Sequence, residues 1–388
     1  MNLFKKLGLL AATTVATLMF GTMAFGFEQT GASESSVKVN FGAYSSSTKV
    51  YYQLAEDSTF TMITQSDYTY GGDKTFYSLV AGRAYYVRFN AGYGWTEGLQ
   101  VVTVPDMTSS HAVSQVAAGA GTATVSWPRV AGASGYMVYV NNVQQPSVTT
   151  NRATVRVPSA ATSTLVKVSP YKRSATGYIA RYEYNYNSVY VKSKPGKPSK
   201  VKYSSTSSTS LGLDWSDVNN ASGYQLEYAN YKGKGKNYAD TGYSSYYYFS
   251  HPKNTFYRFR VRAYVTCGGK KFYGDWSAYS YISKDLTYND VKLKNASTRY
   301  QNRIRVSWNK MKGAKKYVVY MAQGSAAGFK KVKTTKSNTF VVSKYRGRNL
   351  ALHTNYYFKV VAVGKYKGKK LKSPNKASTG CYIYRYYY

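Results

Sequence analysis

Few residues in this sequence are spaced for acid–base, nucleophilic or metal chemistry. The three histidines, His111, His251 and His353, lie far apart, and none is near a cysteine or a group of carboxylates. The two cysteines, Cys267 and Cys381, form no Cys-x-x-Cys pair, so the usual spacing of a zinc site is absent. The 16 Asp and Glu residues form no recognisable pair for general acid–base work. We therefore expect no enzymatic activity, no metal and no cofactor.

The chemistry that the sequence favours is the binding of anions. The chain has 53 Lys and Arg against 16 Asp and Glu, a formal net charge of +37. Residues 286–388 hold 24 of these cations against one carboxylate, Asp290, whereas residues 27–105 have 5 cations and 7 carboxylates. This gradient is steeper than solubility requires. We predict that the C-terminal region binds a polyanion; a highly soluble surface with mobile lysines is the alternative.

Three cationic runs in this region supply the candidate contacts. The last run follows a strand that we expect to end near Ala362, and we predict that it forms a long hairpin loop with Gly368 at its tip. Binding of this kind should weaken steeply with salt because it depends on counterion release. The candidate polyanion-binding residues are Lys330, Lys331, Lys333, Lys344, Arg346, Arg348, Lys365, Lys367, Lys369, Lys370 and Lys372.

The elements that must position these residues are short repeated strands. Ile304, Val306 and Trp308 alternate with polar residues, which is the pattern of a half-buried strand. Tyr317 follows Trp308 by nine residues, after a break at Gly313. The same offset of nine recurs twice, from Trp127 to Tyr136 and from Trp215 to Tyr224. The chain is therefore predicted to be a repeat protein.

A second repeated pattern is Tyr-x-apolar-x-apolar-x-Ala, which begins at Tyr85, Tyr257 and Tyr356. Together with the Trp and Tyr of the earlier strands, it resembles the framework of the fibronectin type III domain, and the form at residues 313–320 is similar to versions in secreted proteins of Gram-positive bacteria. The resemblance implies an all-β fold of tandem immunoglobulin-like sandwiches, with a tyrosine corner in which a buried ring turns its hydroxyl back to upstream backbone. It implies a structural core that contains Trp127, Tyr136, Trp215, Tyr224, Tyr257, Trp308, Tyr317, Tyr356 and Tyr85.

Turn- and linker-forming residues indicate where the domains begin and end. Residues 1–26 have the basic, apolar and small-residue order of a secretory signal peptide. Four fibronectin-type-III-like modules are expected at 27–105 (degenerate), 106–195, 196–285 and 286–388 (strongly basic). The linkers between them are short, which predicts an elongated rod. The two cysteines then fall in different modules, and whether they pair is left open.

The third module has an arginine stripe, Arg258, Arg260 and Arg262, on the outer face of one expected strand. Trp276-Ser277-Ala278-Tyr279-Ser280 follows, and it is similar to the Trp-Ser-x-Trp-Ser element of cytokine-receptor fibronectin modules. The resemblance implies a cation–π ladder of the three arginines with Trp276 and Tyr279, each contact contributing about 0.5–2 kcal/mol. An exposed anion patch is the alternative.

These observations predict a secreted, non-enzymatic cell-surface or adhesion protein, either free or held non-covalently at the cell wall. Teichoic acid of the wall is the favoured polyanion, before extracellular nucleic acid or glycosaminoglycan. The competing hypothesis is a carbohydrate-binding accessory protein that recognises a glycan, and a surface protein is a further candidate partner.

Overall fold

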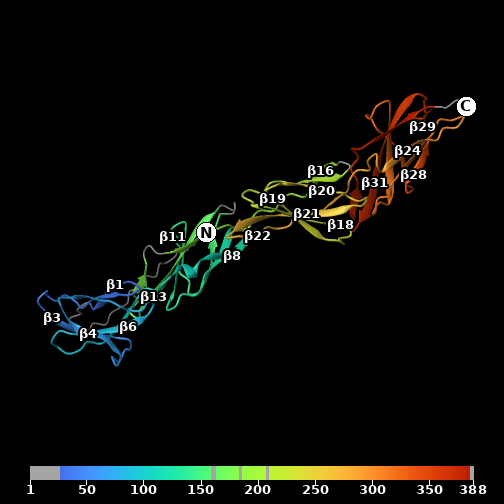
Figure 1. Cartoon of the computed structure of the whole chain (residues 1–388). Helices are drawn as coiled ribbons and strands as arrows, with labels where there is room; N and C mark the ends of the chain where they lie inside the picture. The colour runs from blue at the N-terminus through green and yellow to red at the C-terminus, as the bar shows by residue number, and fades with distance from the viewer. Residues whose placement is uncertain (1–26, 159–162, 183–185, 207–208, 385–388) are drawn as a thin grey trace, which may run out of the picture. The chain divides into compact units, whose positions relative to one another are not determined.

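The computed structural model describes residues 27–158, 163–182, 186–206 and 209–384, and within them the chain is almost entirely β (Figure 1). The one helical turn in these ranges is the 3₁₀ segment Ser109–His111. The expected signal peptide lies outside the described residues.

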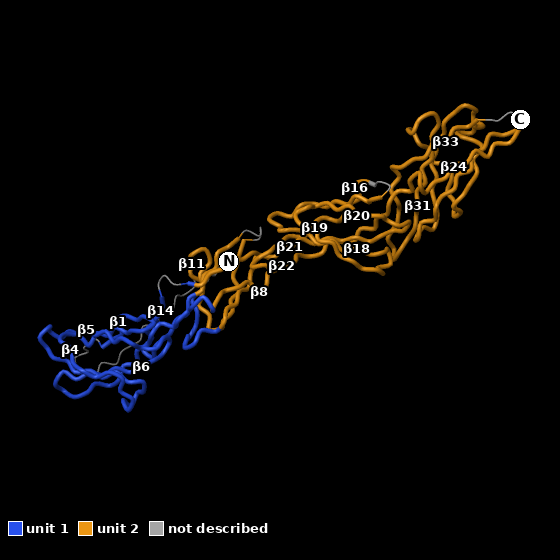
Figure 2. The backbone as a smooth tube through the Cα atoms, in the orientation of Figure 1, with its two compact units in different colours: residues 1–110, 129–137, 169–186 blue, residues 111–128, 138–168, 187–388 orange. Residues whose placement is uncertain are grey.

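The chain divides into two compact units (Figure 2). One comprises residues 1–110, 129–137 and 169–186, and the other comprises residues 111–128, 138–168 and 187–388. The strands fall into four successive groups of paired sheets, and the division between the units passes through the second group.

The first group pairs a sheet of order β1-β2-β5 with one of order β4-β3-β6-β7. Its core contains Phe41, the residue expected to replace the tryptophan of the other copies, and Tyr85. Its strands are β1 (Glu28–Ala32), β2 (Val37–Asn40), β3 (Lys49–Ala55), β4 (Ile63–Tyr70), β5 (Asp73–Phe76), β6 (Ala84–Asn90) and β7 (Leu99–Val102).

The second group has a sheet of order β12-β9-β8 and one of order β11-β10-β13-β14, to which β15 adds through β13. Its strands are β8 (Ser114–Gly119), β9 (Thr122–Ser126), β10 (Gly135–Val140), β11 (Val143–Gln144), β12 (Arg152–Arg156), β13 (Thr164–Arg173), β14 (Ile179–Arg181) and β15 (Asn187–Val191).

The third group repeats this plan, with sheet orders β16-β17-β20 and β19-β18-β21-β22 and with β23 on β21. Trp215 and Tyr224 lie in its core. Its strands are β16 (Lys202–Thr206), β17 (Ser210–Asp214), β18 (Gly223–Asn230), β19 (Asn237–Gly242), β20 (Tyr246–Ser250), β21 (Tyr257–Cys267), β22 (Lys270–Tyr273) and β23 (Ser280–Ile282).

The fourth group has sheet orders β24-β25-β28 and β27-β26-β31-β32, with β33 on β31, and a separate hairpin β29-β30. Trp308, Tyr317 and Tyr356 are buried in its core. Its strands are β24 (Val291–Asn295), β25 (Ile304–Trp308), β26 (Lys316–Gln323), β27 (Lys330–Thr335), β28 (Thr339–Val342), β29 (Lys344–Tyr345), β30 (Arg348–Asn349), β31 (Thr354–Tyr366), β32 (Lys369–Lys372) and β33 (Thr379–Ile383).

The offset of nine residues between Trp and Tyr has a physical cause. In each copy the Tyr hydroxyl accepts a hydrogen bond from the backbone N–H of the third residue after the Trp: from Val130 to Tyr136 (2.9 Å), from Val218 to Tyr224 (2.7 Å) and from Met311 to Tyr317 (3.0 Å). The bond closes the loop between two strands and satisfies an N–H that lies at or near the core. A loop of this length lets the hydroxyl reach the same N–H in all three copies.

A second set of tyrosines closes the turn before the late strand. The hydroxyls of Tyr85, Tyr257 and Tyr356 accept the N–H of Val80 (2.9 Å), Lys253 (2.9 Å) and Ala351 (2.8 Å). This is the geometry of a tyrosine corner, in which a ring packed on the core holds upstream backbone. Tyr85 and Tyr356 are buried, while Tyr257 is only partly buried.

Replacing Tyr317 by phenylalanine tests the first of these bonds. The ring stays, but the N–H of the buried Met311 loses its acceptor, which costs about 1–3 kcal/mol for an unsatisfied buried donor. We expect hydrogen exchange of β26 peptides to become faster, by the factor that corresponds to this loss of free energy. Tyr320→Phe on the outer side of the same strand is the matched control and should change exchange little. Equal effects of the two variants would contradict this role of the Tyr317 hydroxyl.

Candidate anion-binding surface and arginine ladder

Two adjacent central strands of the fourth sandwich, β26 and β31, bring lysines from distant parts of the sequence onto one sheet face. Residues paired across neighbouring strands point to the same side of a sheet. Tyr320 on β26 pairs with Lys331 on one side and with Lys359 on the other. This row therefore places Lys331 and Lys359 on the same face, with the tyrosine ring between them.

The next rows extend the same face. Val363 lies four residues after Lys359 on β31 and therefore on the same face. It pairs with Lys316 on β26 and with Lys372 on β32. Lys365 then pairs with Lys370. We call the set Lys316, Lys331, Lys359, Lys365, Lys370 and Lys372 the lysine face. All six are exposed except Lys359, which is half-buried with its ammonium 4.4 Å from the centre of the Phe329 ring.

The structure distributes the predicted residues over three places. All eleven are exposed. Lys330, Lys331 and Lys333 lie on the edge strand β27, whereas Lys344, Arg346 and Arg348 lie in the separate hairpin β29-β30 and its turn. Lys365, Lys367, Lys369, Lys370 and Lys372 belong to the β31-β32 hairpin. Sequence reasoning missed Lys316 and Lys359, although their positions on alternating strands could have revealed them.

The prediction of a long loop over residues 365–372 is wrong. Strand β31 continues past Ala362 to Tyr366, and β32 pairs with it from Lys369 onward. The turn is only Lys367-Gly368, with φ angles of 44° and 77°, which is the left-handed geometry that a two-residue hairpin turn requires. Gly368 is at the tip as expected, but the lysines are held in register by the strand ladder because Gly364 and Leu371 are buried beneath them.

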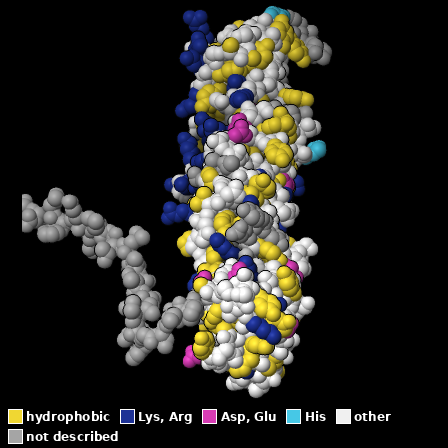
Figure 3. All heavy atoms as spheres, turned by 90° about the vertical axis from the view of Figure 1, so that its left-hand side faces the viewer, with side chains coloured by type: hydrophobic (Ala, Val, Ile, Leu, Met, Phe, Trp, Pro, Cys, Tyr) yellow, Lys and Arg dark blue, Asp and Glu magenta, His cyan; other side chains and the backbone are white. Residues whose placement is uncertain are grey.

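The cations of this surface have no carboxylate partner among the described residues. The one carboxylate of residues 286–388, Asp290, is buried and accepts hydrogen bonds from Lys284 (2.9 Å) and Asn254 (2.9 Å). Burial alone would raise the pKa of Asp290, but the hydrogen bonds from Lys284 and Asn254 lower it overall. This carboxylate is therefore ionised, and its charge is balanced by Lys284 and not by the surface lysines. Figure 3 shows dark-blue Lys and Arg side chains along one edge of the upper part of the molecule, which includes the C-terminal region.

The three arginines of the third sandwich each lie over aromatic rings. The Arg258 guanidinium is 4.5 Å from the Tyr279 ring centre, and the Arg260 guanidinium is 4.4 Å from that of Trp276 and 4.8 Å from that of Tyr279. The Arg262 guanidinium is 4.4 Å from the Trp276 ring centre and 3.8 Å from that of Tyr273, a residue absent from the sequence prediction. This arrangement is an alternating stack of cations and rings.

Polar side chains of the neighbouring strand β18 hold this stack in place. Glu227, fully buried, accepts a hydrogen bond from the Arg260 guanidinium (2.6 Å) and another from the Tyr279 hydroxyl (2.7 Å). Gln225 accepts from Arg262 at 2.7 and 2.9 Å. Burial raises the pKa of Tyr279, and Glu227 raises it further, so the phenol stays protonated and donates. The arginine side chains are thus engaged in a stack on the outer face of the sheet, opposite the core residues Phe259 and Val261, which argues against an open anion patch there.

The described residues contain no group of three or more His, Cys, Asp or Glu side chains placed to hold a metal ion. Within the same ranges, no helix is both long and apolar enough to cross a membrane. Cys267 and Cys381 are free thiols, so the pairing left open by the sequence is not present.

The sheet orders define the class of protein. Each group is a three-stranded sheet packed against one of four or five strands around a shared core, and strands adjacent in sequence repeatedly change sheet. The chain is an all-β protein of tandem immunoglobulin-like, fibronectin-type-III-like sandwiches.

Solved structures of fibronectin type III domains match this chain. The chicken CNTN1 FN1–FN3 domains match with 16% identity and a TM-score of 0.33, over 67% of this chain and 97% of that one. A segment of two fibronectin type III domains from chicken tenascin matches with 11% identity and a TM-score of 0.26, over 44% of this chain and 97% of that one. No protein-family model and no curated protein matches the sequence.

Proposed function

We propose that this chain is a secreted, non-enzymatic cell-surface or adhesion protein whose fourth sandwich binds an anionic polymer. The observation that carries the proposal is the exposed set of lysines and arginines on β26, β27, β31, β32 and the β29-β30 hairpin, with no carboxylate partner among the described residues. Net charge of one sign on a folded surface raises the local concentration of an oppositely charged partner.

A flexible polymer with regularly spaced phosphates suits this surface because the lysines are presented in rows and not in a closed pocket. The lysine face can exchange the counterions of several polymer phosphates for its own ammonium groups, and the released ions drive association. Cell-wall teichoic acid is the favoured polymer, and glycosaminoglycan or extracellular nucleic acid would meet the same surface. Binding would hold the protein at the wall without a covalent bond.

The test is to measure binding of the full chain to poly(glycerol phosphate) as salt is varied. With about five phosphate contacts, the association constant should fall roughly 100-fold between 50 and 200 mM salt. Neutral glucose should not compete. An affinity insensitive to salt would contradict polyanion binding, and competition by the neutral sugar would favour a carbohydrate-binding accessory protein.

A further inference from the structure

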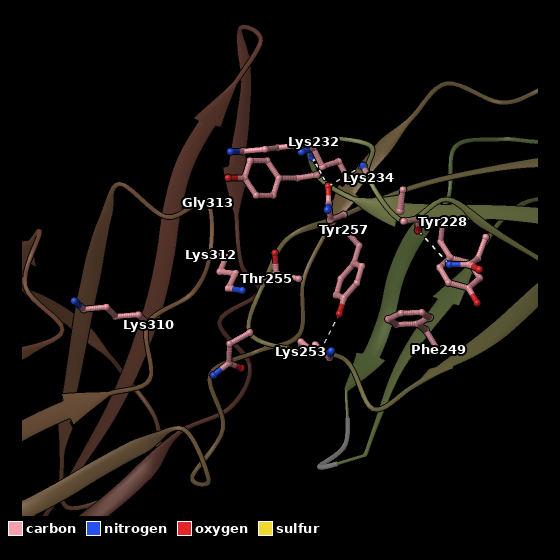
Figure 4. A pocket seen from close by; sticks show the side chains of 16 residues that line it. Tyr228, Lys232, Lys234, Phe249, Lys253, Thr255, Tyr257, Lys310, Lys312 and Gly313 are labelled. Atoms are coloured by element: carbon pink, nitrogen blue, oxygen red, sulfur yellow. Dashed lines mark hydrogen bonds between the residues drawn. The ribbon is translucent and has the colours of Figure 1, made fainter.

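An open cavity of about 900 Å³ lies beside the end of β18 and the start of β21 (Figure 4). Sixteen residues line it. They come from the end of β18 and the segment after it, from the start of β19, from β20, from the segment before β21 and its first residue, and from residues 310–313 between β25 and β26. Its volume is in the range of pockets that take small organic ligands.

The charge of this cavity has one sign. Its lining includes Lys232, Lys234, Lys253, Lys310 and Lys312, all exposed, and no carboxylate. In Figure 4, the Lys312 side chain lies near Thr255, whereas the Lys310 side chain extends away from the aromatic side chains. An anionic group placed here would meet several ammonium groups and no carboxylate of the lining; the nearby Asp290, which accepts from Asn254, is already paired with Lys284.

One wall of the cavity is aromatic. Phe249 lies between Tyr228 and Tyr257, with ring centres 5.1 and 4.9 Å away, and all three rings are partly buried (Figure 4). The Tyr257 hydroxyl accepts the backbone N–H of Lys253 at 2.9 Å, which leaves its own proton to donate. All three rings offer apolar faces, and the two tyrosines add a polar hydroxyl.

The backbone N–H groups of three of these lysines are held by hydrogen bonds. The Asn230 side-chain oxygen accepts the N–H of Lys232 (2.9 Å) and of Lys234 (3.1 Å). The N–H of Lys312 donates to the carbonyl of Asn254 at 2.9 Å. The backbone that presents the lysines is therefore preorganised, which lowers the entropy lost when a ligand binds.

We propose that this cavity binds a saccharide unit that carries a phosphate or sulfate ester. The lysines would hold the ester group, and the aromatic wall would take the apolar C–H face of the sugar ring. An inorganic anion would use only the lysines, and a neutral sugar only the wall. The proposal does not depend on polymer binding by the lysine face because the two use different residues.

The test is calorimetric titration of the full chain with four probes: glucose 6-phosphate, glucose 6-sulfate, glucose and inorganic phosphate. We expect at least one ester to bind more tightly than both glucose and inorganic phosphate, and the two esters identify which anion is preferred. The variant Lys232→Gln, Lys234→Gln, Lys312→Gln should weaken the preferred ester about tenfold, given the loss of three nearby charges.

The matched control removes the same charge from strand β27 with Lys330→Gln, Lys331→Gln and Lys333→Gln. It should leave ester binding unchanged but weaken poly(glycerol phosphate), so failure of the cavity and failure of the polymer surface can be told apart. Three outcomes would overturn the proposal: no binding of either ester at millimolar concentration, inorganic phosphate binding as tightly as the esters, or equal losses in the two triple variants.

Discussion

Replacing Glu227 by alanine should lower the free energy of unfolding of the third sandwich by about 3–5 kcal/mol. The Glu227 carboxylate is fully buried and accepts from both Arg260 and Tyr279. Its removal leaves a half-buried guanidinium and a phenol without their acceptor, inside a stack that cannot easily rearrange. Hydrogen exchange of peptides from β18 and β21, measured by mass spectrometry, reports the loss directly.

Two comparisons make the Glu227 result specific. Glu227→Gln keeps the shape of the side chain and one acceptor oxygen but removes the charge. We therefore expect a loss of unfolding free energy between zero and that of Glu227→Ala. Asp217→Ala, at an exposed position of the same sandwich, should change the free energy of unfolding by no more than about 0.5 kcal/mol. A loss below about 1 kcal/mol for Glu227→Ala would mean that the stack does not need its carboxylate.

The same carboxylate predicts a pH dependence. Burial alone would raise the pKa of Glu227, but hydrogen bonds from Arg260 and Tyr279 lower it overall from its ordinary value of 4.5. A group with a lowered folded pKa contributes stability that is present above the ordinary pKa and is lost as the pH falls through the folded one. The difference between the native protein and Glu227→Ala should therefore be constant above about pH 5 and shrink in more acidic solution.

The second large effect concerns polymer binding. Neutralising the five exposed members of the lysine face should weaken binding of poly(glycerol phosphate) by roughly 1,000-fold or more at low salt, since each lysine near an anionic surface contributes about 1 kcal/mol. The fold should survive because these side chains point to solvent. The variant is Lys316→Gln, Lys331→Gln, Lys365→Gln, Lys370→Gln and Lys372→Gln.

A control of equal charge separates the location of charge from its total. Five exposed cations of the second and third sandwiches and the segment between them are replaced in the same way, which should cost less than about tenfold through the weaker long-range field alone. Similar losses in the two variants would show that net charge, and not the lysine face, determines binding. The control is Arg152→Gln, Arg156→Gln, Lys197→Gln, Lys200→Gln and Lys202→Gln.

The sequence predicted the all-β sandwiches because their framework is local. Alternating Ile304, Val306 and Trp308 form β25 as expected, and Tyr317 is buried on β26 at the position that its hydroxyl bond to Met311 requires. Patterns of this kind depend on strand period and on loop length, and both can be read along the chain.

The parts that were missed depend on pairing between distant strands. A carboxylate such as Glu227 in a strand looks solvent-facing until Arg260 is known to lie opposite it in the register. In the same way, Lys316 and Lys359 join the lysine face only through the pairing of β26 with β31. The sequence predicted a loop at the lysine-rich hairpin because charged residues dominate this segment, and its two inward positions, Gly364 and Leu371, are too few to form an alternating pattern.

The most direct test of the proposed function is a lysine-acetylation footprint of the full chain with and without poly(glycerol phosphate), read by mass spectrometry. We predict protection of Lys316, Lys331, Lys365, Lys370 and Lys372, reversed by 0.5 M salt, with Lys38, Lys49 and Lys74 of the first sandwich labelled equally in both states. Protection spread evenly over the chain, or confined to the first sandwich, would contradict the assignment of polymer binding to the fourth.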